Sequence, residues 1–169
     1  VSGIVHEHGG EVQKFIGDAV LAVFSSDTDP DRARANAMKS ARAIVAFLAA
    51  LPRHAGTPSI ECAIGLAAGP VLYGNVGSHE RLDFTVIGQA ANVAARLGDL
   101  GKEAGHRIMV SQDLLPSADA ETAIACATRC AQEATGDQIK SLGQVKLHNV
   151  SEPVICFAIS ADARSYQLD

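Results

Sequence analysis

The sequence predicts an α+β domain in which helices pack on a mostly antiparallel sheet. Residues 10–24 hold two runs rich in Val, Phe and Ile around a Gly-Asp pair, which is typical of a tight β-hairpin. Residues 33–48 carry an apolar side chain every three or four positions, as does a helix packed on a sheet. Residues 59–76 alternate in polarity on either side of a Gly-Pro pair, which predicts a second hairpin.

The composition excludes several classes of protein. The chain has 169 residues, of which 47% are hydrophobic and 20% charged, and this fits one soluble globular domain. A net charge of −5 argues against nucleic acid as a partner. No apolar run could span a bilayer and no basic-apolar leader is visible, so we expect a cytoplasmic domain whose parent protein would reach a membrane only through other regions. The cysteines form no CxxC pair, which favours buried free thiols at Cys62, Cys126, Cys130 and Cys156.

The first quarter of the chain predicts a helix end, a hairpin and a long helix. Residues 1–8 look like the last turns of a helix whose start is missing, so we expect residues 1–169 to be one N-terminally truncated domain. The second run of the hairpin is almost wholly apolar, which predicts a place in the middle of a sheet with a buried back. Asp29 supplies the N-cap and Pro30 the first residue of the long helix, which closes at Pro52.

The rest of the chain alternates strand-like and helix-like segments. We expect strands at 59–68, 71–76, 82–87, 107–110, 138–142, 144–147 and 154–159. The last three fit a meander at the sheet edge. We expect helices from residue 88, from the Ser111 cap to Leu115, and at 119–135.

The helix that begins after Gly88 carries one polar stripe. Its other positions are mainly alanine, valine and leucine, and the polar residues follow at steps of three, four and three: Gln89, Asn92, Arg96 and Asp99. Asn92 and Arg96 therefore point the same way. The stripe fits either an ordinary solvated face or a functional one. In the first hairpin, likewise, Asp18 fits a plain turn former and Lys14 a cation that reaches solvent.

Four motifs in order resemble the catalytic domain of class III nucleotidyl cyclases, the adenylate and guanylate cyclases. They are Gly10-x3-Lys14-Phe15-Ile16-Gly17-Asp18, Ile64-Gly65-Leu66-x2-Gly69-Pro70-Val71, Val86-Ile87-Gly88-x3-Asn92-Val93-Ala94-Ala95-Arg96 and Ile108-Met109-Val110-Ser111. The resemblance covers nearly the whole chain. It implies a ferredoxin-like α+β core and active sites shared across a head-to-tail homodimer.

The resemblance also implies a role for five residues. Asp18 matches the second of two aspartates that hold a pair of Mg²⁺ or Mn²⁺ ions against the triphosphate. Lys14 matches the purine-selecting lysine and Thr85 its partner, and an ammonium beside a hydroxyl favours ATP over GTP. Asn92 matches the residue that orients the ribose, and Arg96 the one that stabilises charge on the α-phosphate. We therefore expect an adenylate cyclase that makes cyclic AMP and pyrophosphate for intracellular signalling.

The sequence differs from the family pattern in two places. The segment with the first metal aspartate would lie upstream of Val1, so we expect the 169-residue chain alone to be inactive. Where relatives often have Leu-Lys-Gly, this chain has Leu147-His148-Asn149, so we assign no phosphate-binding residue there. The alternatives are a degenerate cyclase-like dimerisation or regulatory module and a diguanylate cyclase. The latter is disfavoured because Gly9-Gly10-Glu11 precedes the hairpin and does not form its tip.

Overall fold

The fold was analysed in a computed structural model, which describes residues 1–25, 28–52, 60–78, 81–115 and 138–160. Its elements, in chain order, are α1 (Ser2–Glu7), β1 (Glu11–Ile16), β2 (Ala19–Val23), α2 (Pro30–Ala50), β3 (Ile64–Leu66), β4 (Leu72–Ser78), β5 (Arg81–Ile87), α3 (Gln89–Ala104), β6 (Ile108–Ser111), the 3₁₀ turn η1 (Gln112–Leu114), β7 (Gln138–Val145) and β8 (Val154–Ser160). The predicted α+β class is confirmed. The helix predicted at 119–135, with Cys126 and Cys130, lies outside the described residues.

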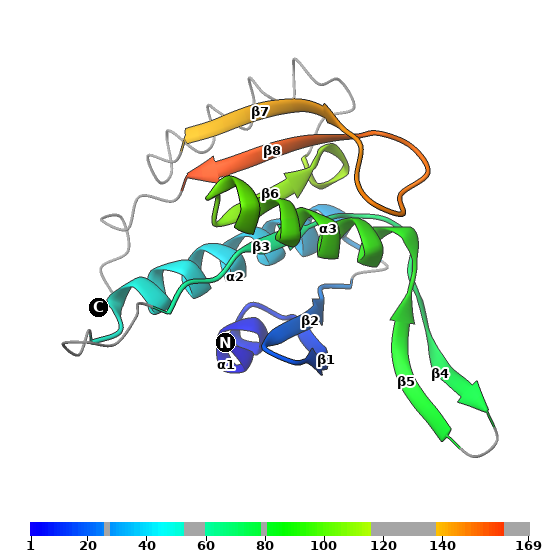
Figure 1. The fold of residues 1–169 in the computed structure, drawn as a ribbon. Coiled ribbons are helices and arrows are strands. Elements are labelled where there is room, and N and C mark those ends of the chain that lie inside the picture. Colours follow the sequence, from blue (N-terminus) through cyan, green and yellow to red (C-terminus); the bar gives the residue numbers. More distant parts are fainter. Residues whose placement is uncertain (26–27, 53–59, 79–80, 116–137, 161–169) are drawn as a thin grey trace.

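The central sheet has the strand order β3-β6-β8-β7 and lies between two helices (Figure 1). Alternate residues of β6 and β8 face opposite sides, because successive side chains in a strand point to opposite faces. One side packs against α2 and buries Ala41, Val45, Ile108, Val110, Leu114, Leu115, Phe157 and Ile159. The other side packs against α3 and buries Val93, Leu97, Met109, Leu147, Val150, Cys156 and Ala158.

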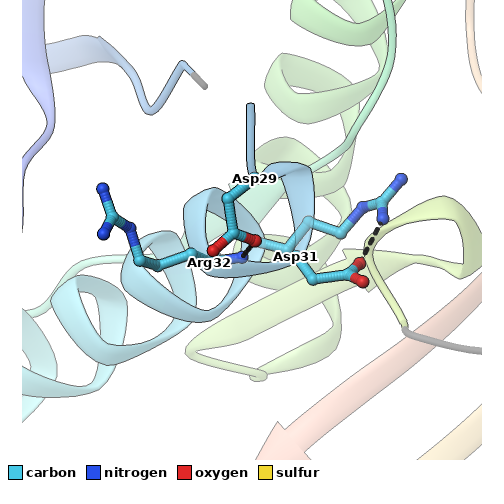
Figure 2. Close-up of polar contacts among 4 residues, drawn as sticks. Asp29, Asp31 and Arg32 are labelled. Carbon is cyan, nitrogen blue, oxygen red and sulfur yellow. Dashed lines mark hydrogen bonds and ion pairs between the residues drawn. The ribbon is translucent and has the colours of Figure 1, made fainter. Parts of the chain in front are cut away.

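The long helix α2 begins where the sequence predicts. The Asp29 side chain accepts a hydrogen bond from the backbone N–H of Arg32 at 3.0 Å, which satisfies one of the unpaired donors of the first turn (Figure 2). Asp31 forms an ion pair with Arg34 at 2.7 Å, also within the first two turns. The predicted N-cap and the proline at the first helical position are therefore confirmed.

The first hairpin has the predicted turn but not the predicted place. Gly17 has φ +62°, which the turn between β1 and β2 requires and which glycine adopts without strain. β1 and β2 nevertheless form a two-stranded sheet of their own, and Phe15 and Ile16 are 64% and 58% exposed. The prediction of a buried position in the middle of a sheet is therefore wrong. Although the residues of β2 are apolar, none of them is fully buried, because β2 pairs only with β1 among the described strands.

The prediction of a second hairpin, in residues 59–76, is also wrong. β3 pairs in parallel with β6, and β4 pairs with β5 to form an antiparallel arm that extends away from the central sheet (Figure 1). β3 is also shorter than predicted. Alternation along residues 59–76 indicates which side chains share a face, but it does not select the partner strand. β4 runs to Ser78, two residues beyond the predicted strand end at residue 76.

The C-terminal strands differ in detail from the prediction. Residues 138–145 form one strand, β7, with a register shift at Gly143, whose φ of +69° explains the predicted break. β7 lies at the sheet edge, whereas β8 lies inside the sheet between β6 and β7. The short helix predicted after Ser111 is present as η1 with Ser111 at the N-cap position, but the buried Ser111 side chain makes no cap hydrogen bond to it.

Cys62 and Cys156 are free thiols, half-buried and buried respectively, as predicted for these two. Burial raises the pKa of both, that of Cys156 to about 11. In the described part of the chain, no helix is both long and apolar enough to cross a membrane.

Candidate functional site

Lys14 and Thr85 lie on two strands that are in contact, β1 and β5. Lys14 follows a register shift in the β1–β2 pairing, where the strand turns locally. Thr85 pairs across the arm with Gly74 of β4. Both side chains are half-buried, so each is screened in part from water and still open to a ligand.

Tyr73 of β4 connects the arm to the first hairpin. Burial raises the pKa of the Tyr73 hydroxyl, while a hydrogen bond with the Ser25 side chain lowers it and the Glu11 carboxylate raises it. Ser25 follows β2 and Glu11 begins β1, so these groups bring the start of the arm to the base of the hairpin. No motif in the sequence marks Tyr73.

Asp18 lies exposed at the tip of the β1–β2 hairpin, directly after Gly17. A hairpin tip can present a carboxylate to a ligand without burying its charge. Hard divalent cations prefer several oxygen ligands, however. Among the described residues no group of three or more His, Cys, Asp or Glu side chains could hold a metal ion. The side chains described here therefore do not by themselves make a metal site, and Asp18 contributes one carboxylate.

Asn92 and Arg96 lie one turn apart on the outer face of α3. The opposite face buries Val93, Leu97 and Gly101, so packing on the sheet fixes the rotation of the helix. Asn92 is exposed and Arg96 is half-buried. The predicted polar stripe is therefore confirmed as the solvent-facing side of α3.

Arg96 also lines an open cleft of about 620 Å³ between α3 and the connection from β7 to β8. Its Nη1 atom donates a hydrogen bond to Oδ2 of Asp99 at 2.9 Å. The lining is mainly charged and comprises Arg96, Asp99, Leu100, Lys102, Glu103, Val145, Lys146, Leu147 and His148. The structure thus brings Arg96 together with Lys146 and His148, which the sequence analysis left unassigned because Leu147-His148-Asn149 departs from the family motif.

The geometry thus gathers the predicted residues into two groups. Lys14, Thr85 and the hairpin tip with Asp18 belong to the half of the molecule formed by β1, β2 and the arm. Asn92 and Arg96 lie on α3, which begins directly after β5 and Gly88. Gly88 has no room for a side chain, because a Cβ there would lie 2.7 Å from the carbonyl oxygen of Pro70. The end of the arm therefore fixes the start of the helix.

The four sequence motifs and this α+β order of elements both agree with the nucleotidyl cyclase class. The chain belongs to the family described as the adenylate and guanylate cyclase catalytic domain, whose model matches residues 2–149. Members of this family generally use divalent metal ions. An uncharacterized protein of Mycobacterium tuberculosis is 37% identical over 150 residues, which are 89% of this chain and 24% of that protein. The chain thus spans about a quarter of the length of this curated relative.

Solved structures of cyclases share the fold. The adenylyl cyclase CyaB from Pseudomonas aeruginosa superposes with a TM-score of 0.71 at 23% identity, over 98% of this chain and 79% of that one. The non-canonical dimeric guanylyl cyclase domain of the RhoGC fusion protein from the aquatic fungus Blastocladiella emersonii does so with a TM-score of 0.59 at 20% identity, over 92% of this chain and 75% of that one. Because the similar folds include both an adenylyl and a guanylyl cyclase, the fold leaves the choice of base open.

Proposed function

We propose that this domain is an adenylate cyclase, which converts ATP to 3′,5′-cyclic AMP and pyrophosphate. The proposal is carried by the contact between β1 and β5, which brings the strands of Lys14 and Thr85 together. An ammonium donates to adenine N1, which is an acceptor, and the adenine amine donates to the threonine hydroxyl. Guanine carries a hydrogen at N1 and would place one donor against another, so this pair favours ATP.

The reaction forms one bond and breaks one. The ribose 3′-oxygen attacks the α-phosphorus, the bond from that phosphorus to the bridging oxygen of the β-phosphate breaks, and pyrophosphate leaves with the electron pair. The 3′-hydroxyl proton passes to solvent. In this scheme Asn92 orients the ribose by hydrogen bonds. The Arg96 guanidinium neutralises the charge that grows on the α-phosphate oxygens, for which a planar fork of donors is well suited.

We also propose that two copies form the working unit and act in the cytosol. The exposed apolar side chains of the hairpin and the arm favour an interface there: Phe15, Ile16, Leu72, Tyr73 and Ile87. In the proposed head-to-tail arrangement each chain gives Asp18 to one site. It gives the other predicted site residues, Lys14, Thr85, Asn92 and Arg96, to the second site. Asp18 would be one ligand of a divalent ion, Mg²⁺ or Mn²⁺, that binds the triphosphate.

The first test concerns the base. Lys14→Glu should weaken the use of ATP and admit GTP when Thr85 is also changed to a residue that accommodates guanine, because a carboxylate accepts hydrogens from guanine N1 and N2. The measurement is kcat/KM of the full-length protein for ATP and GTP side by side, and Lys39→Glu on the exposed side of α2 is a matched control for the charge change. A preference of the unmodified protein for GTP would show that Lys14 does not select adenine.

The second test concerns the shared site. Full-length chains carrying Asp18→Ala and full-length chains carrying Arg96→Ala should each be inactive alone, and mixing them should restore one intact site per heterodimer. The expected recovery is about a quarter of wild-type activity, because half of the dimers are mixed and each has one of two sites. If the mixture is no more active than either variant, the shared-site arrangement is wrong.

A dimerising module without catalysis remains the second candidate. The same exposed apolar residues on β1, β4 and β5 would serve it equally well. The two candidates separate in one assay with ATP and Mn²⁺. A protein that forms dimers but makes no cyclic nucleotide, in the full-length form as well as the 169-residue form, is such a module.

A further inference from the structure

The guanidinium assigned above to the α-phosphate already has an anionic partner in this structure. Arg96 and Asp99 are three residues apart on α3, and their side chains meet at 2.9 Å. Both remain open to solvent, with exposed fractions of 39% for Arg96 and 63% for Asp99. The Asp99 carboxylate therefore binds the Arg96 guanidinium at a place that a phosphate group can still reach from solvent.

The charges around this ion pair differ on the two sides of the cleft. On the α3 side, Lys102 and Glu103 follow the pair. On the side of the β7–β8 connection, the ionisable groups in the lining are Lys146 and His148. Both carboxylates of the lining, those of Asp99 and Glu103, thus come from α3. A polyphosphate in this cleft would meet basic side chains from both sides and two carboxylates from one.

The relative strengths of the two contacts decide which one persists. An exposed ion pair contributes little, since water and salt screen it and both side chains lose rotamer freedom. An arginine fork binds phosphate more strongly, through two parallel charge-assisted hydrogen bonds. On this comparison a polyphosphate should displace the Asp99 carboxylate from Arg96.

We propose that Asp99 is a positioning residue that holds Arg96 at the cleft as an internal substitute for phosphate and is displaced when nucleotide binds. The proposal rests on the function proposed above for Arg96. Because the Arg96–Asp99 contact must break before the substrate is bound, Asp99 weakens nucleotide binding. Once the phosphate is in place the contact is gone, so the chemical step is unaffected.

The test replaces the carboxylate with a neutral side chain of the same shape. In the full-length protein, Asp99→Asn should lower KM for ATP by about two- to five-fold, the range that corresponds to an exposed ion pair, and should leave kcat within about twofold. Glu103→Gln is the matched control. It removes one negative charge from the same helix and the same cleft but leaves the Arg96–Asp99 pair intact, so its effect on KM should be smaller.

A binding measurement separates this proposal from the proposed reaction. Titration calorimetry with inorganic triphosphate should give a Kd for Asp99→Asn that is lower by the same two- to five-fold, about the factor expected for KM. In an Arg96→Gln background, Asp99→Asn should change that Kd no more than Glu103→Gln does. Triphosphate binding with this pattern but without cyclic nucleotide formation would refute the proposed reaction and support the displacement.

Three results would overturn the displacement. Equal effects of Asp99→Asn and Glu103→Gln would show a general electrostatic effect of the cleft. A fall in kcat with unchanged KM would show that Asp99 braces Arg96 during the reaction. Wild-type protein that binds no triphosphate would show that Arg96 is not a phosphate contact in this chain.

Discussion

The close approach of α3 to β3 makes Gly65→Ala the most informative test of how the site helix is held. A Cβ at Gly65 would lie 2.5 Å from the backbone nitrogen of Gly98 and 2.9 Å from the Cβ of Leu97, and it would overlap the carbonyl oxygen of Ala94. Ala94 and Gly98 are four residues apart, so these two backbone atoms are the acceptor and donor of one helical hydrogen bond. The added methyl group would therefore be forced against the backbone of α3, which cannot rotate away as a side chain can.

The size of the effect follows from these distances. Unbonded heavy atoms prefer separations of about 3.5–4.0 Å, so α3 must move by on the order of 1 Å to accept the methyl group. Overpacking of this kind lowers the free energy of unfolding by about 1–3 kcal/mol. Because the obstacle is backbone, we expect the upper half of that range. The shift also carries Asn92 and Arg96 with the helix, so kcat should fall as well.

Gly98→Ala is the matched control, because it adds the same methyl group on the other side of the same contact. Its Cβ would lie 3.7 Å from the nitrogen of Gly65 and 3.8 Å from the carbonyl oxygen of Ala63, which are ordinary contacts. Alanine is favoured over glycine inside a helix by about 0.5–1 kcal/mol, so this variant should be more stable than wild type. Urea unfolding followed by circular dichroism measures both. A Gly65→Ala variant as stable as wild type would refute the close packing of α3 on β3.

Two further predictions concern the cap of α2 and a buried thiol. Asp29→Ala should lower the free energy of unfolding by about 1 kcal/mol. Asp31→Ala removes an exposed ion pair and a carboxylate of the first helical turn but no cap hydrogen bond, so it should lower the free energy of unfolding by less; equal losses in urea melts would contradict the capping role. Burial raises the pKa of Cys156 from 9.0 to about 11, so between these values the folded chain keeps a proton that the unfolded chain releases, and the free energy of unfolding should fall as pH rises through this window. Cys156→Ala should flatten that slope between pH 9.0 and about 11, and a slope unchanged by the substitution would show that Cys156 is not its source.

The sequence predicted what depends on neighbouring residues and missed what depends on distant ones. The Gly17 turn, the Asp29 cap and the polar stripe of α3 are local patterns, and each appears in the structure where it was predicted. The pairing of β3 with β6 brings together residues more than forty positions apart along the chain. Alternating polarity carries no information on such a partner, which is why the sequence favoured a hairpin of β3 with β4.

The candidate site divides in the same way. Motif spacing selected Lys14, Asp18, Thr85, Asn92 and Arg96, and the structure places Asn92 and Arg96 on one accessible helix face. Their chemical roles stay predictions until the assays above are made. Spacing could not find the contribution of Lys146 and His148 to the Arg96 cleft. That contribution depends on how the β7–β8 connection folds over α3, and Leu147, buried against that helix, fixes it.

The β4–β5 arm has a consequence for how the specific activity should vary with protein concentration. An isolated two-stranded ribbon is only marginally stable in water, and among the described residues the element outside the arm that this ribbon contacts most is β1. In the proposed dimer the partner would cover the exposed Leu72 and Ile87, so ordering of the ribbon and association would be one equilibrium. Dilution below the dissociation constant would then loosen the segment that carries Thr85, and turnover per chain would decline together with the order of the arm.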